Sequence, residues 1–262
     1  MISPLILCAR DGAVAVVTLN NPTKLNALST PMLHALAAEF DTIAADPAVR
    51  VVVVRAAGKA FCAGHDLKEI QVARQAPDGG AAAFAALFTL CSRVMQQIAG
   101  MPKPVIAEVQ GIATAAGCQL AATCDMVVAS DQARFGVNGV NIGLFCSTPI
   151  VALSRKIPHS AAFELAATGE FLTATRAQSL GLANRVTSVE ELSSETMALA
   201  QSLAQKLPAA LSIGKAAFAA QTGLPLDQAY AAAGAAMVDN LLDASTSEGI
   251  SAFLEKRAPN WA

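Results

Sequence analysis

The sequence predicts an α/β fold in which buried strands alternate with helices in a layered spiral. First, short β-branched runs such as residues 50–55 (RVVVVR) are typical of strands that are buried on both faces. Second, a strand–turn–helix–strand unit recurs without a fixed repeat length, which favours a spiral over a tandem array. Third, 262 residues suffice for one large α/β domain with a helical appendage.

The alternating elements occupy the N-terminal part of the chain. Ser29, with Pro31 close behind it, is typical of a helix start, and Asp46 followed by Pro47 ends that helix. Residues 71–80 are expected to form a loop or a frayed helix. We expect strands at residues 13–19, 50–55, 103–109 and 125–129, and helices at residues 29–45, 81–99 and 115–123.

Helical patterns dominate the remainder of the chain, after a glycine-rich stretch at residues 135–149. We therefore divide the protein into an α/β core, residues 1–200, and a C-terminal helical part, residues 201–262. This helical part is expected to cover neighbouring copies of the chain. Its helices and those just before it are expected at residues 161–168, 174–180, 189–206, 209–222, 227–242 and 246–256.

Composition narrows the classes of partner. Hydrophobic residues make up 54% of the chain and charged residues only 15%, which predicts apolar surface that is buried against other copies. No run of 18 strongly apolar residues occurs, so we expect no membrane span. The net charge is −2, and no cluster of Lys and Arg marks a nucleic-acid surface, so we expect no nucleic-acid partner.

Cysteine and histidine usage gives no sign of disulfides or of a metal site. The six cysteines are scattered without a C-x-x-C pair, and the three histidines lack metal-ligand spacing. Free thiols are typical of a reducing compartment. Residues 1–4 lack the basic segment that begins a targeting signal. From these two observations we expect a cytoplasmic protein.

Two short stretches carry most of the functional information. Residues 59–68 (KAFCAGHDLK) and 111–119 (GIATAAGCQ) each follow a β-branched run and open into a segment with helical spacing. A strand that turns sharply through Ala and Gly leaves free backbone N–H groups at the start of the next helix. Two such turns that face each other would bind a developing negative charge.

These stretches, with several others, resemble the enoyl-CoA hydratase/isomerase (crotonase) superfamily along nearly the whole chain. Within this superfamily the chain most resembles the branch called enoyl-CoA hydratase domain-containing protein three. The residues that carry this resemblance are 143–149 (GLFCSTP), 237–240 (MVDN) and 248–261 (EGISAFLEKRAPNW). The superfamily resemblance rests on the order and spacing of residues 19–28 (LNNPTKLNAL), 61–67 (FCAGHDL), 103–107 (KPVIA), 117–121 (GCQLA), 124–125 (CD), 133–136 (ARFG), 168–170 (TGE) and 177–183 (AQSLGLA).

The resemblance implies the crotonase fold, a spiral of ββα units with a C-terminal helical part, assembled as a homotrimer or homohexamer. It implies an acyl-CoA thioester as ligand, with coenzyme A as part of the substrate and no separate cofactor. The main-chain amides of His65 and Ala116 would hold the thioester oxygen as an enolate forms. The implied substrate-binding positions are Lys24, Ala63, His65, Asp66, Leu67, Lys68, Asn141 and Phe145, with Lys24 near the phosphates and Ala63, His65 and Lys68 at the adenine.

The chain departs from the familiar hydratases at both acid–base positions. Those enzymes use two glutamates, one to activate water and one to deliver a proton to the α-carbon. Here the two positions hold Gln119 and Gly139. A neutral amide is no general base near pH 7, and glycine has no side chain. We therefore expect two-glutamate hydration to be weak or absent, and expect glutamate at both positions to raise it.

Three functions are compatible with these residues. The first is an active enzyme on acyl-CoA that uses the two amides with another acid–base group. The second is an acyl-CoA-binding protein of lipid metabolism with little catalysis. The third is an acyl-transfer hydrolase, which we rank lowest because no G-x-S-x-G motif occurs. Cys118 and Cys146 are possible nucleophiles or simply buried thiols, and Asp66 is expected to cap the helix that follows it.

Overall fold

The computed structural model describes residues 3–261; Met1, Ile2 and Ala262, at the ends of the two predicted parts, lie outside the described residues. A six-stranded sheet forms the centre of the fold. Its first two strands are antiparallel and all other neighbours run parallel. The strand order is β1 (Ile6–Asp11), β2 (Val14–Leu19), β3 (Val51–Ala56), β5 (Val105–Val109), β7 (Met126–Ser130) and β10 (Arg185–Thr187).

A second sheet of three-residue strands lies beside the first. It contains β4 (Ala60–Cys62), β6 (Ile112–Thr114), β8 (Arg134–Gly136) and β9 (Phe171–Thr173), in that order. The first three follow β3, β5 and β7 almost directly, so one strand of each sheet and then a helix form a repeating ββα unit. This arrangement confirms the predicted spiral. The ββα units were expected from the family resemblance alone, because a strand of three residues is too short to show a β period in the sequence.

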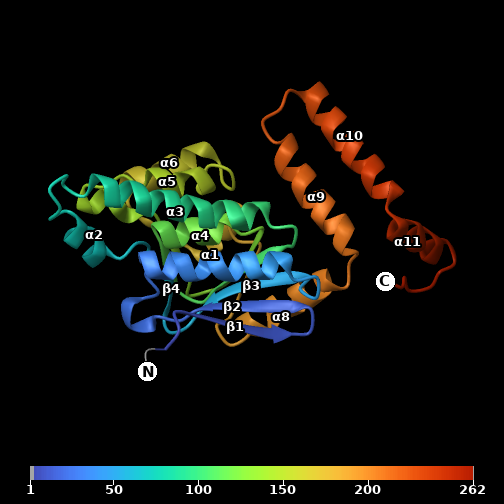
Figure 1. The fold of residues 1–262 in the computed structure, drawn as a ribbon, viewed down its shortest axis with the longest axis horizontal. Helices are drawn as coiled ribbons and strands as arrows, with labels where there is room; N and C mark the ends of the chain where they lie inside the picture. The colour runs from blue at the N-terminus through green and yellow to red at the C-terminus, as the bar shows by residue number, and fades with distance from the viewer. Residues whose placement is uncertain (1–2, 262) are drawn as a thin grey trace.

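Helices cover both faces of the large sheet. The main apolar core lies between the sheets and α1 (Thr30–Ala45), α3 (Ala81–Gly100) and α4 (Ala116–Thr123). Figure 1 shows α1 and α3 on the side of β2 and β3 opposite to α8 (Leu192–Ala204), which packs over a smaller cluster that includes Val53 and Ile106. Ser29 caps α1 as predicted, because its side chain accepts a hydrogen bond from Met32 N.

Two 3₁₀ turns and four shorter helices surround the two sheets. They are the 3₁₀ turns η1 (Pro22–Lys24) and η2 (Asn138–Ile142) and the helices α2 (Leu67–Ala73), α5 (Ser147–Leu153), α6 (His159–Thr168) and α7 (Ala174–Ser179). Among the described residues, α3 is the single helix long and apolar enough to cross a membrane. Leu87, Val94 and Ile98 of α3 are buried, and α3 packs on α1, so we interpret it as a core helix.

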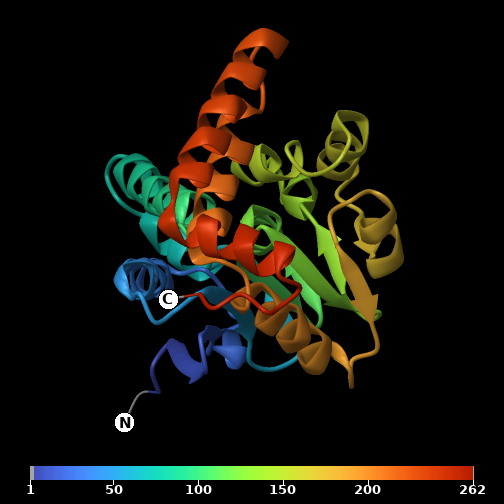
Figure 2. The ribbon, with the colours of Figure 1, turned by 90° about the vertical axis from the view of Figure 1, so that its right-hand side faces the viewer.

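The last three helices form an arm that leaves the core (Figures 1 and 2). They are α9 (Pro208–Gln221), α10 (Leu226–Leu242) and α11 (Ala244–Leu254), and α9 and α10 contain no buried residue. Lys215 ties α9 to the core, since its Nζ donates to Asp125 Oδ2 at 2.7 Å and to Ile98 O at 2.9 Å. The boundary predicted at residue 200 lies within α8. Since α8 packs on the large sheet, the whole of this helix is part of the core.

Candidate active site

The two turns singled out in the sequence are in direct contact. Strands β4 and β6 pair in parallel, so the turns that leave them begin at the same edge of the small sheet. Gly64, with φ +88°, lies so close to the second turn that a Cβ on it would be 3.3 Å from Ala116 N. A Cβ on Gly117 would lie 2.2 Å from the carbonyl oxygen of Cys62. Both glycines are therefore needed for the turns to approach each other.

The backbone at the second turn is held in an uncommon conformation. Ala115, the residue before α4, has φ 49° and ψ −121°, a region that residues with a side chain rarely adopt. Such backbone strain is a recurring feature of functional sites. Ala116 is the first residue of α4, where an N–H group has no acceptor within the helix. Its amide is thus available to a ligand at the positive end of a helix.

A cavity of about 500 Å³, hereafter the main cavity, opens between the two turns and the loop of residues 138–149. Its size is in the range of small-molecule sites. Of the predicted site residues, the main cavity brings together Ala63, His65, Leu67, Ala116, Gly139, Asn141 and Phe145. The lining also includes Asn138, which the sequence offered as a group to position water or substrate, and Cys146, a possible nucleophile. Thr114, Ile142, Leu144 and Thr148 complete it without having been singled out in the sequence.

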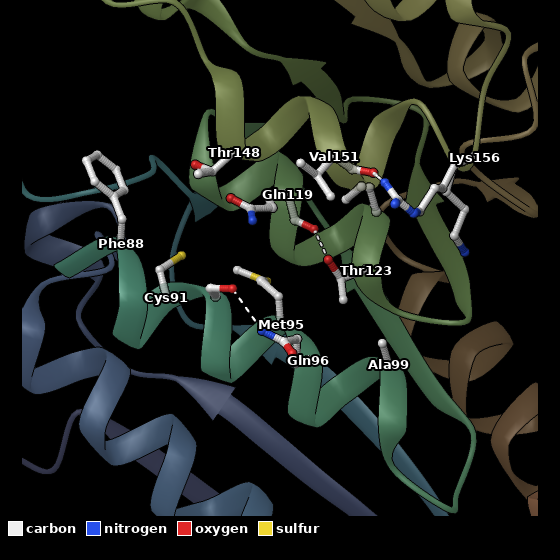
Figure 3. Close-up of a pocket in the computed structure, with 14 residues that line it drawn as sticks. Phe88, Cys91, Met95, Gln96, Ala99, Gln119, Thr123, Thr148, Val151 and Lys156 are labelled. Carbon is white, nitrogen blue, oxygen red and sulfur yellow. Dashed lines mark hydrogen bonds between the residues drawn. The ribbon is translucent and has the colours of Figure 1, made fainter. Parts of the chain in front are cut away.

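Gln119 lies at the edge of a neighbouring cavity and not in the main one. This side cavity, of about 380 Å³, is lined by α3, α4 and α5, and Figure 3 shows the Gln119 side chain next to Thr148 and across the cavity from Cys91 and Met95 of α3. Phe88 and Thr148 line both cavities, which places the two side by side. Gln119 is 6% exposed, and its buried Oε1 has no hydrogen-bond partner among the described residues.

Gly139 has no space for any side chain. A Cβ there would lie 2.3 Å from Leu144 O and 2.8 Å from Cys146 Sγ, and Leu144 N donates to Gly139 O at 2.9 Å. The loop therefore folds back on Gly139 and fills the volume that a glutamate would need. This changes one expectation: glutamate at positions 119 and 139 would displace the loop and is not expected to restore hydration.

The imidazole of His65 is held in one tautomer. Its Nδ1 lies 3.1 Å from Leu28 O, and because a carbonyl only accepts, Nδ1 carries the proton. The ring packs edge-to-face on Phe88, with ring centroids 5.6 Å apart. Burial lowers the pKa of His65 below its ordinary value of 6.5, so the ring is neutral at pH 7. Its Nε2 is buried and has no hydrogen-bond partner within residues 3–261.

Two cysteines proposed as possible nucleophiles are protonated thiols. Burial raises the pKa of Cys118 to about 12, and burial also raises the pKa of Cys146. A nucleophilic cysteine needs a lowered pKa, so this environment disfavours the hypothesis. Among the described residues, no group of three His, Cys, Asp or Glu side chains is placed to hold a metal ion.

The predicted charged positions lie outside the main cavity. Asp66 caps α2 as predicted, since its Oδ1 accepts from Lys68 N at 3.0 Å. Its other oxygen accepts from Lys24 Nζ at 3.1 Å, and this bond helps lower the pKa of Asp66 against the opposing effect of burial. Lys24 and Lys68 are exposed beside the first turn.

Two residues that support or line the site escaped sequence analysis. Asn26 is fully buried, and its Nδ2 donates to Ala57 O and Ala60 O, which fixes the start of β4. Phe88 lines both cavities but sits on a helix whose apolar pattern predicts only core packing. Asn26 lies within the matching stretch of residues 19–28, which could have pointed to it, because a buried Asn must satisfy several hydrogen bonds. The sequence around Phe88 offered no such signal.

Comparison with known proteins identifies the family. A family model described as enoyl-CoA hydratase/isomerase matches residues 9–262. The mitochondrial enoyl-CoA hydratase domain-containing protein 3 of Danio rerio is 44% identical over 260 residues, covering 99% of this chain and 88% of that protein. The Homo sapiens protein of the same name is 44% identical and is matched over 94% of this chain and 80% of its own length.

Solved structures agree with these relatives. A Mycobacterium smegmatis enoyl-CoA hydratase has 51% identity and a TM-score of 0.94, with 99% of each chain covered. The human enoyl-CoA hydratase domain-containing protein 3 has 42% identity and a TM-score of 0.93, covering 98% of this chain and 100% of that chain. These similarities confirm the predicted branch resemblance and the crotonase fold.

The relatives also correct the predicted location. Five vertebrate relatives at 40–44% identity are all named as mitochondrial, which points away from a cytoplasmic protein. The prediction was wrong because free thiols exclude only an oxidising compartment and do not distinguish one reducing compartment from another. The match over residues 9–262 and the relatives at these identities show that this chain belongs to the enoyl-CoA hydratase/isomerase family.

Proposed function

We propose that this protein binds an acyl-CoA thioester and stabilises its enolate between the main-chain amides of His65 and Ala116. The observation that carries the proposal is the contact between the two turns at the wall of the main cavity. Both amides precede or begin a helix, so the helix dipoles add to the two hydrogen bonds. Preorganised donors of this kind stabilise charge that develops in the transition state.

The nucleotide end of coenzyme A would lie outside the main cavity, along the first turn. Lys24 and Lys68 are exposed there and would pair with phosphates. The family resemblance implies that the backbone of Ala63 and His65, two residues that also line the cavity, contacts the adenine. The exposed Lys24 ammonium already pairs with Asp66, so a phosphate would exchange one anionic partner for another. Asn141 and Phe145 would contact the acyl part from the facing loop.

Hydration by the two-glutamate mechanism is not expected of this site. Gln119 supplies no carboxylate, and the loop packed on Gly139 leaves no room for one. A positioned acid or base typically contributes about 10²–10⁴ in rate, so the loss of both lowers hydration by at least about 10². Since no carboxylate of residues 3–261 lines the main cavity, the second candidate function is a largely non-catalytic acyl-CoA-binding protein.

The exposed arm supports a homotrimer or homohexamer. Large apolar side chains of α9, α10 and α11 remain uncovered in a single chain, among them Phe218, Leu226, Tyr230, Leu242 and Phe253, each more than 70% exposed. Exposed apolar side chains concentrated on one set of helices are typical of a protein–protein interface. Other copies of the chain would bury it, in keeping with the apolar composition.

One experiment separates the two candidate functions from an ordinary hydratase. We expect crotonyl-CoA and octanoyl-CoA to raise the melting temperature, since a ligand at about 100 times its Kd stabilises by about 2.7 kcal/mol. We expect the absorbance of the conjugated crotonyl thioester to decay at least about 10²-fold more slowly than with a two-glutamate hydratase assayed alongside. Hydration as fast as with that control enzyme would contradict the inference that Gln119 and Gly139 leave the site without its acid–base carboxylates. Absence of any thermal shift would contradict the thioester site.

A further inference from the structure

We propose that the imidazole of His65, through Nε2, is the base that removes the α-proton of the bound acyl group. The inference rests on the proposed enolate site and supplies the acid–base group that the missing glutamates leave open. His65 would then act twice, with its main-chain amide on the thioester oxygen and its side chain on the α-carbon.

His65 is one of two residues lining the main cavity that carry a titratable side chain. Of the residues that line it, only His65 and Cys146 carry a group that titrates between about pH 4 and 10. The Cys146 thiol is held protonated by its burial, so it cannot accept a proton near pH 7. Gln119 and Gly139, where the carboxylates would be, cannot act as bases.

The tautomer of His65 suits it to accept a proton. Because Nδ1–H donates to Leu28 O, the free electron pair of the neutral ring is on Nε2. This atom is buried and has no partner among the described residues, an arrangement that costs free energy unless a ligand uses it. The Leu28 carbonyl would also stabilise the imidazolium, since Nδ1–H becomes a stronger donor when the ring is charged.

The elements packed around the ring show how a substrate could reach it. The N-terminal approach to α1 supplies the Leu28 carbonyl, α2 supplies the carboxylate of Glu69, and α3 supplies the uncharged ring of Phe88. Glu69 is itself held by Thr30 N at 2.9 Å. Phe88 packs edge-to-face on the imidazole and lines both cavities, and its ring would have to turn aside for an acyl group to reach Nε2.

The step balances without a further reactant. The Nε2 electron pair takes the α-proton, the C–H bonding pair becomes the C=C bond of the enolate, and the thioester oxygen takes the negative charge between the two amides. Return of the proton from imidazolium to carbon restores the thioester. In D₂O the imidazolium exchanges its proton for a deuteron, so the product carries deuterium at the α-carbon.

The test measures deuterium incorporation into octanoyl-CoA in D₂O by mass spectrometry. We expect the unaltered protein to exchange the α-protons, and His65→Asn to exchange them about 10²–10⁴-fold more slowly with unchanged affinity for octanoyl-CoA. Asn keeps both the backbone amide and a donor near Leu28 O, so only the base is lost. His65→Gln provides a second variant, and His159→Asn, at an exposed position that begins α6, controls for the loss of a histidine.

The pH profile gives an independent readout. The base must be neutral to accept a proton, and the pKa of His65 lies below 6.5. The exchange rate should therefore be constant above about pH 7 and should decrease as the pH falls through the pKa of His65. Undiminished exchange in both His65 variants, or a rate that keeps rising to pH 9, would overturn the proposal. Binding of octanoyl-CoA without exchange would overturn it too while leaving the thioester site intact. Failure to bind octanoyl-CoA would contradict the proposed function itself.

Discussion

Ala116→Pro is expected to lower the rate of enolate formation by about 10²–10³ while the fold is retained. Proline lacks an N–H and is tolerated at the first position of a helix, which Ala116 occupies in α4. The substitution therefore removes one of the two donors proposed for the thioester oxygen, and loss of one such donor typically costs this factor. The measurement is deuterium exchange into octanoyl-CoA, together with affinity for octanoyl-CoA and for coenzyme A, which has no thioester carbonyl.

The matched control is Ala244→Pro. Ala244 is the exposed first residue of α11, so the same substitution is made at the same helix position away from both cavities. We expect this control to exchange at the normal rate, and the affinity of Ala116→Pro for free coenzyme A to be unchanged. Full exchange activity in a folded Ala116→Pro protein would show that the Ala116 amide does not hold the thioester oxygen.

Gly117→Ala is expected to lower the free energy of unfolding by about 1–3 kcal/mol or more, and to weaken acyl-CoA binding. A Cβ at this position would lie 2.2 Å from Cys62 O and 2.7 Å from Cys62 Cβ. Both Cys62 and Gly117 are buried, and the carbonyl belongs to the rigid small sheet, so α4 must move away from β4. That movement separates the two turns whose contact defines the site. Chemical denaturation and octanoyl-CoA titration measure the two effects.

Gly214→Ala is the control that separates the effect of the Gly117 clash from the effect of alanine on helix propensity. Gly214 lies inside α9, and a Cβ there would meet no atom within 4 Å. Alanine is favoured over glycine by about 1 kcal/mol inside a helix, so this control should gain stability. If Gly117→Ala were as stable as Gly214→Ala and bound octanoyl-CoA normally, the close approach of the two turns would not matter to the site.

The four central strands of the large sheet and the long helices could be predicted because their signals are local, whereas the three-residue edge strand β10 could not. The valine run of β3 shows burial on both faces, and the cap at Ser29 sets the start of α1. The amide-bearing turns were also predictable, because Gly64 and Gly117 follow strand patterns and precede helical ones. The small sheet was not, since its strands have three residues each and exist only through pairing with one another.

The packing around Gly139 and around the His65 ring could not be predicted from one sequence. The family resemblance predicts a carboxylate where this chain has Gly139, yet only the fold shows that Leu144 O and Cys146 Sγ occupy the space. Likewise, the orientation of the His65 ring depends on Leu28 and Phe88, which lie 37 and 23 positions away. Contacts between segments so distant along the chain leave no periodic pattern to detect.

The most direct test of the central claim is a crystal structure with octanoyl-CoA bound. The account predicts that the thioester oxygen lies about 2.7–3.1 Å from the main-chain nitrogens of both His65 and Ala116. It also predicts the acyl α-carbon beside the imidazole of His65, with Phe88 turned aside. A thioester oxygen hydrogen-bonded to neither nitrogen, in a complex whose acyl group is clearly seen, would contradict the account.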